Sequence, residues 1–293
     1  MKGRIRLAGW WYPGIFFSVS LAKHWLHGVF MKIIVCIKQV PDIAEIETME
    51  TDPETGTIVR EGLPSIVNPF DEYALEEAIS WKEKLGAEVI AITMGPPQAE
   101  DALVKALSMG ADQAILLSDG AFAGSDTIAT TYTLAGAIRK IGDFDLIFCG
   151  KQAIDGDTAQ VGPMLAENLR IPQITYVNHV EIEGKHVVAR RELEDSYEVV
   201  RCKMPVLLSV IKGINIPRVP TFGSLSDAME KEIPVWTAED LDVEKKRLGL
   251  SGSPTAVTRV WTPDPRPRGE VLTGEPSELA ERLAGILLNI LQS

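Results

Sequence analysis

The sequence predicts an open, doubly wound α/β sheet, in which mostly parallel strands alternate with helices. Short, continuous apolar runs lie at residues 33–37, 89–93, 114–117 and 146–149, as expected of strands that are buried on both faces. Between them lie segments such as 125–140, whose apolar residues recur at helical spacing. Ligands of such sheets bind beyond the carboxyl ends of the strands, near a reversal of strand order. We therefore look for a site in the loops that follow the apolar runs.

The predicted helices carry recognisable start and stop signals. The run Asn68-Pro69-Phe70-Asp71-Glu72 combines an N-cap asparagine, a proline at the first helical position and acids in the first turn. That helix is expected to end near Gly86. Further helices are predicted at 98–109 and 164–169.

After Pro172 the pattern becomes antiparallel. A hairpin is predicted over 176–192, followed by strands at 196–202 and 206–211. We expect a nucleotide-binding α/β domain over 31–213. Residues 214–293 are predicted to form a partner-docking loop and an extended arm that ends in an amphipathic helix at 278–291. An arm without a core of its own usually lies on a partner, and a mobile tail is the alternative.

Composition excludes several classes of function. The formal charge of −12 argues against a nucleic-acid partner. The three cysteines fit no metal-ligand spacing, and two of them, Cys36 and Cys149, fall inside apolar strands. They are therefore expected to be reduced and buried, as in the cytoplasm. No Ser/His/Asp set and no P-loop lysine are recognisable, so we assign neither a catalytic residue nor a metal site.

The first thirty residues differ from the rest. They contain no Asp or Glu, four basic residues and three tryptophans. A signal peptide would lack a good cleavage region here, and a membrane anchor would be interrupted by Lys23 and His24. Because Met31 immediately precedes a core strand, we interpret 1–30 as a non-native leader and Met31 as the initiator. We expect no direct membrane insertion.

The most informative stretch is the loop 150–163, which joins an apolar strand to a helix and is rich in glycine and small polar residues. The free amides at a helix start and the helix dipole together attract anions. The alternative is that Asp157-Thr158-Ala159-Gln160 is only a capping box. Asp155 and Asp157 suggest acid/base or magnesium chemistry, but a structural role in the loop is the stronger interpretation.

A second loop, 118–127, also joins a strand to a helix and offers free amides and hydroxyls. Here the alternative is a flexible loop with Ser125 as N-cap. Two such loops suit a diphosphate better than a single phosphate. The turns Val40-Pro41-Asp42 and Met94-Gly95-Pro96 follow the first two strands and could wall an adenine.

Taken together, these segments resemble the beta subunit of electron transfer flavoproteins. The resemblance runs from Met31 to about Met229. It rests on four segments in order: 35–41, 68–78, 106–112 and 150–163. It implies an adenine nucleotide α-hydrolase-like fold and a heterodimer with an alpha subunit that carries an FAD.

The resemblance also implies an adenine nucleotide in this chain. Ordinary members of the family hold AMP, whereas a second group holds FAD and oxidises NADH. In that group one electron passes to ferredoxin or flavodoxin, and the other passes through the alpha-subunit FAD to an acyl-CoA dehydrogenase-type partner. The runs 123–127 and 155–163 resemble the second group. The predicted cofactor contacts are Cys36, Val40, Asn68, Pro69, Phe70, Asp71, Met94, Gly95, Ser125, Asp126, Thr127, Gly150, Lys151, Gln152, Ala153, Ile154, Asp155, Gly156, Asp157, Thr158, Ala159, Gln160 and Val161.

Phe222 lies where the family presents an apolar anchor for docking its partner, although a core position is the alternative. Relatives continue with a basic run, whereas this chain has Ser226-Asp227-Ala228-Met229-Glu230-Lys231-Glu232. A nucleotide-binding module of the universal-stress type is the hypothesis from another class. An ATP pyrophosphatase would need a Ser-Gly-Gly-rich loop after the first strand, and the run 38–41 is unlike it.

Overall fold

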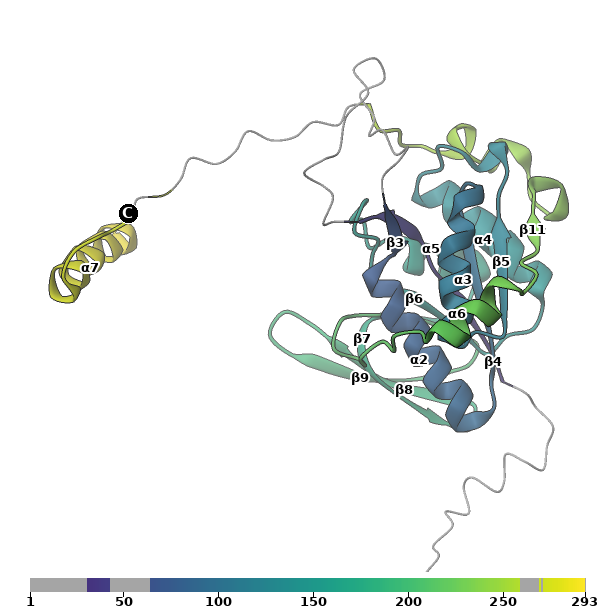
Figure 1. The fold of residues 1–293 in the computed structure, drawn as a ribbon, viewed down its shortest axis with the longest axis horizontal. Coiled ribbons are helices and arrows are strands. Elements are labelled where there is room, and N and C mark those ends of the chain that lie inside the picture. Colours follow the sequence, from purple (N-terminus) through teal and green to yellow (C-terminus); the bar gives the residue numbers. More distant parts are fainter. Residues whose placement is uncertain (1–30, 43–63, 259–268, 270, 293) are drawn as a thin grey trace, which may run out of the picture. The chain divides into compact units, whose positions relative to one another are not determined.

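A computed structural model describes residues 31–42, 64–258, 269 and 271–292 (Figure 1). The predicted leader 1–30 lies outside the described residues. The chain divides into two compact units: the first holds the α/β body as far as Val257, and the second holds the C-terminal helix. Among the described helices, none combines the length and the apolar content that a bilayer crossing needs.

The body is built on a nine-stranded sheet of order β11-β5-β4-β1-β6-β10-β7-β8-β9. The strands as far as β7 pair in parallel, and β8 and β9 continue antiparallel. This arrangement confirms the predicted α/β fold class. The bounds are β1 Lys32–Cys36, β4 Glu88–Met94, β5 Gln113–Leu117, β6 Leu146–Gly150, β7 Gln173–Glu183, β8 His186–Glu192, β9 Tyr197–Lys203, β10 Val206–Val210 and β11 Val235–Trp236. A separate antiparallel pair joins β2 (Gln39–Pro41) to β3 (Ser65–Val67).

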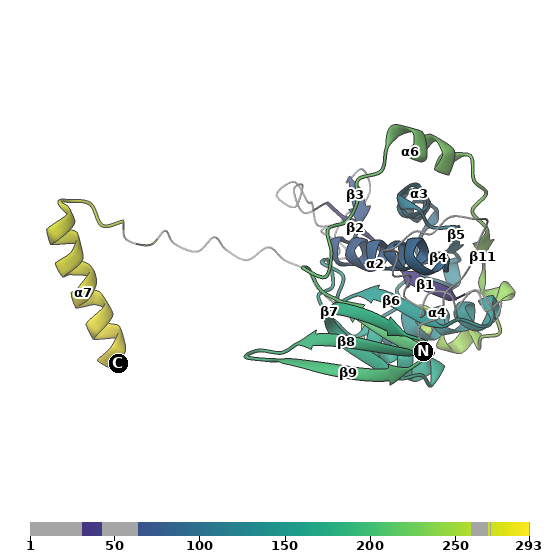
Figure 2. The same cartoon turned by 90° about the horizontal axis from the view of Figure 1, so that it is seen from below.

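Helices cover both faces of the sheet. They are α2 (Pro69–Leu85), α3 (Glu100–Met109), α4 (Thr127–Ile141) and α5 (Val161–Leu169). Figure 2 shows α2 and α3 on one face and α4 on the other. Alternate residues of β1 divide between the two cores: Ile33 packs with the α2 side and Ile34 with the α4 side. Burial on both faces explains why the strands are continuous apolar runs.

Strand order reverses between β1 and β6. From β1 the chain builds outward through β4 to β5, then returns to place β6 on the other side of β1. The carboxyl ends of these neighbours, at Cys36 and Gly150, therefore flank the crevice in which such folds bind ligands.

The stretch after residue 213 returns to the body, whereas we expected an extended arm from residue 214. A capping box at Thr221 starts α6 (Phe222–Met229), which packs on α3. β11 then pairs with the edge strand β5. These elements are too short for their apolar periodicity to be visible in the sequence.

Within the second unit, α7 spans Pro276–Gln292, close to the predicted 278–291. Its apolar side chains are exposed: Leu283, Ile286, Leu287 and Ile290 all keep at least 40% of their surface.

Candidate functional site

The first turn of α2 ties the ends of β1 and β6 together. The buried Asp71 carboxylate accepts the Lys38 amide at 2.8 Å and the Gly150 amide at 3.0 Å. Asn68 precedes the helix as predicted, but its side chain makes no cap. Instead its amide nitrogen donates to the Gln152 carbonyl at 2.8 Å, and its amide oxygen accepts the Ile154 amide at 3.2 Å. Both side chains therefore fix the loop after β6.

Burial controls the ionisation of the groups beneath this turn. It raises the pKa of Asp71 to about 7, although the hydrogen bonds from Asn68, Lys38 and Gly150 act in the opposite direction. Burial, with a smaller contribution from Asp71, raises the pKa of Cys36 to about 12, and burial also raises that of Cys149. The two cysteines are register partners in β1 and β6 and are free thiols, as predicted. They are accordingly poor nucleophiles.

The loop after β6 adopts an unusual backbone conformation. Asp157 and Ala159 have φ angles of 52° and 53°, in the left-handed region that residues other than glycine rarely adopt. Among the described residues, no hydrogen bond is found from the backbone amides of Thr158, Ala159 and Gln160. Alternating left-handed residues with free amides form a concave anion site. Strain of this kind persists where function requires it.

The capping-box interpretation of this loop is wrong. The N-cap of α5 is Gln160, which makes no side-chain cap. The Asp157 carboxylate instead accepts a hydrogen bond from the Gln152 side chain. Asp155 forms an ion pair with Lys38 at 2.7 Å and so links the loops after β1 and β6. Both acids thus have structural partners.

The loop before α4 lies against the loop before α5. The Thr127 hydroxyl donates to the Gln160 side-chain oxygen at 3.2 Å. The N-cap of α4 is Asp126 rather than Ser125, and it accepts the amides of Ile128 at 2.8 Å and Ala129 at 3.1 Å. Asp126 directly precedes the first helical residue, Thr127, whereas the Ser125 hydroxyl donates to the Phe122 carbonyl at 2.8 Å. The Ser125 and Thr127 amides have no acceptor within the described part of the chain.

Three further predicted contacts, Val40, Met94 and Gly95, lie in or directly after strands β2 and β4. Val40 is buried in β2, and Met94 ends β4, which is the neighbour of β1. Gly95 lets the backbone after β4 pack closely against Ala99, because a Cβ at position 95 would stand 2.7 Å from the Ala99 Cβ. The space around Gly150 is smaller still, since a Cβ at position 150 would stand 2.4 Å from Asp71 Oδ1.

Beside Phe70 and Lys151 lies a cavity of about 470 Å³ that the sequence did not predict. The Lys151 ammonium lies 5.4 Å from the ring centre of Tyr176, which also lines the cavity. Tyr176 has a φ of 58° at a register shift in β7. No residue type signals such a shift, so this neighbour of the site was missed.

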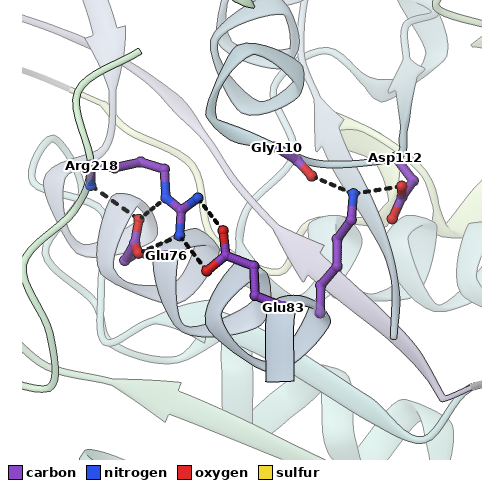
Figure 3. Close-up of polar contacts among 6 residues, drawn as sticks. Glu76, Glu83, Gly110, Asp112 and Arg218 are labelled. Atoms are coloured by element: carbon purple, nitrogen blue, oxygen red, sulfur yellow. Dashed lines mark hydrogen bonds and ion pairs between the residues drawn. The ribbon is translucent and has the colours of Figure 1, made fainter. Parts of the chain in front are cut away.

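Phe222 is 89% exposed, which excludes the core alternative within the described residues. It follows a segment that Arg218 anchors to α2 (Figure 3). Arg218 donates to Glu76 through Nε at 2.8 Å and Nη2 at 2.9 Å, and to Glu83 through Nη1 at 2.6 Å. The acidic partners raise the pKa of Arg218, and the hydrogen bond from Arg218 lowers that of Glu83.

Comparisons with known proteins agree on one family. Residues 55–241 match the electron transfer flavoprotein domain. The chain is 53% identical to the electron transfer flavoprotein subunit beta of Clostridium acetobutylicum, over 85% of this chain and 95% of that protein. It is 49% identical to the caffeyl-CoA reductase-Etf complex subunit CarD of Acetobacterium woodii, over 83% and 92% of the two chains. It is 45% identical to protein FixA of Azotobacter vinelandii, over 86% and 92%. The chain therefore belongs to the electron transfer flavoprotein family, in which its relatives include beta subunits.

Proposed function

We propose that this chain is the FAD-binding, NADH-oxidising beta subunit of a heterodimeric electron transfer flavoprotein. The main support is that the loops before α4 and α5, both of which have free backbone amides, lie next to each other. The Thr127–Gln160 hydrogen bond joins them. One loop before a helix would serve a single phosphate, as in AMP. Two loops that lie against each other offer donors to both phosphates of a dinucleotide.

The loop composition supports the longer ligand. A Cβ at Gly156 would meet no atom within 4 Å, so the space beside it is open. The proposed donors to a second phosphate are the Thr158 hydroxyl and, once it is released from Gln160, the Thr127 hydroxyl. The adenine end is proposed to bind between the carboxyl ends of β1 and β4, near Cys36 and Met94, which are neighbouring strands of the sheet.

Bound FAD would supply the hydride and single-electron chemistry. The residues of this chain bind and orient the cofactor, and no catalytic side chain is required. Asp71 and Asn68 keep the loop after β6 in place. We propose that the backbone amides of the Asp157–Ala159 turn bind phosphate, so that no lysine side chain is required for phosphate binding.

Family membership implies an alpha-subunit partner in an electron-transfer complex. We propose that the segment from residue 258, including the exposed apolar side of α7, contacts that subunit. An acyl-CoA dehydrogenase-type flavoprotein is the proposed acceptor of one electron, and the name of the caffeyl-CoA reductase-Etf relative supports this partner. Ferredoxin or flavodoxin is the proposed acceptor of the other electron, and the cytoplasm is the proposed location.

Counting flavins in the purified heterodimer tests the proposal. Two FAD per heterodimer, together with bleaching of flavin absorbance by NADH, is the expected result. One FAD with one AMP, and no reduction by NADH, would instead support the second candidate, a simple carrier with a structural AMP.

Docking at Phe222 has its own test. We expect Phe222→Ala to slow reduction of the dehydrogenase partner by about tenfold or more, as for an exposed aromatic hot spot. Flavin content should not change, since α6 packs on α3, on the face of the sheet opposite α4 and α5. Val199→Ala, an exposed apolar residue on β9, is the control. Unchanged partner reduction in Phe222→Ala would refute the docking role.

A further inference from the structure

Asp126 has no group left for a cofactor. Its amide donates to the Ser253 hydroxyl at 2.8 Å. Its Oδ1 caps α4, and its Oδ2 accepts the Thr255 amide at 3.1 Å and the Thr255 hydroxyl at 2.9 Å. Burial acts to raise the pKa of Asp126, but these hydrogen bonds hold it below its usual range. An ionised carboxylate would repel phosphate, so Asp126 acts through its neighbours.

The segment 249–255 is fitted closely to the loop before α4. The Leu250 amide donates to the Ala123 carbonyl at 3.0 Å. Gly249 has a φ of 54°, and a Cβ there would stand 2.3 Å from the Ala121 carbonyl oxygen. The Ser253 hydroxyl also bonds the Gly249 carbonyl at 2.7 Å, which fixes the segment against itself.

Resting on the proposed function, we propose that residues 249–255 form a positioning element for the second phosphate of the cofactor, acting through Asp126. Asp126 stands between Ser125 and Thr127, whose amides face no protein acceptor among the described residues. When Ser253 and Thr255 hold Asp126, the two amides and the Thr127 hydroxyl are kept opposite the loop before α5. The first phosphate would be held by the amides of Thr158–Gln160, and among the described residues no hydrogen bond joins these residues to the segment.

The proposal therefore predicts a selective effect on cofactor choice. In the heterodimer, Ser253→Ala combined with Thr255→Val should weaken FAD binding by about tenfold, and flavin content should fall from two toward one per heterodimer. AMP binding, measured by titration calorimetry after the nucleotide is removed, should change by less than about twofold. Ser226→Ala, an exposed serine on α6 outside the segment, should change neither, and Thr255→Ser should retain FAD because its hydroxyl can still donate.

The outcomes separate the inference from the proposed function. If the unaltered heterodimer holds two FAD and the double variant also holds two, the inference is overturned but the proposed function stands. Equal losses of FAD and AMP would also overturn it, because they indicate a general structural role. An unaltered heterodimer that holds AMP in place of a second FAD would overturn both.

Discussion

Replacing Arg218 by alanine should destabilise the chain and free the segment that leads to Phe222. The side chain of Glu76 is only 11% exposed, and Arg218 supplies its bidentate partner. Removing one partner of a buried ion pair costs about 3 to 5 kcal/mol, because a charge is left uncompensated. Since the Arg218 side chain is 33% exposed, water can partly replace it, and we expect the lower end, about 3 kcal/mol.

Urea unfolding of the full chain, followed by circular dichroism, measures this loss. Glu83→Gln is the matched control: the side chain of Glu83 is 58% exposed, so its loss should cost about 0.5 kcal/mol or less. Adding Glu76→Gln to Arg218→Ala should restore about 1 to 2 kcal/mol, because the orphaned charge is gone. If Arg218→Ala alone matches Glu83→Gln, the buried-pair reasoning is refuted.

Two further predictions concern the turn that joins β1 to β6. Because the folded-state pKa of Asp71 is about 7 against an ordinary 3.8, the ionised form is disfavoured on folding. We compare the unfolding free energy of the unaltered chain with that of Asp71→Asn, each measured by urea titration. The difference should fall by about 4 kcal/mol as pH rises from about 4 to about 7, and then level off. A difference in unfolding free energy that does not change with pH would contradict this. Gly150→Ala should cost about 3 kcal/mol, because its Cβ would meet Asp71 Oδ1 at 2.4 Å and the Phe70 backbone at 2.6 Å. Gly156→Ala has open space and should cost less than about 0.5 kcal/mol, so equal thermal shifts of the two variants would count against the steric argument.

The sequence by itself determined the alternation of strands and helices, because burial on both faces leaves a readable apolar pattern. It also located the two loops between a strand and a helix, because glycine and small polar residues interrupt the apolar pattern there. The start of α2 was visible as Asn68-Pro69, and the buried thiols as cysteines within apolar runs.

Only the tertiary structure decided which partners each polar group took. Asn68 was predicted to cap α2, yet its side chain bonds Gln152 in the loop after β6. Asp157, for which a helix cap was the alternative role, instead bonds the side chain of Gln152 within its own loop. Asp126 was predicted to contact the cofactor, and the structure shows that Thr255, 129 positions away in the sequence, binds its Oδ2. A carboxylate binds whichever donor the fold brings within about 3 Å, and long-range pairing of that kind leaves no local pattern in a single sequence.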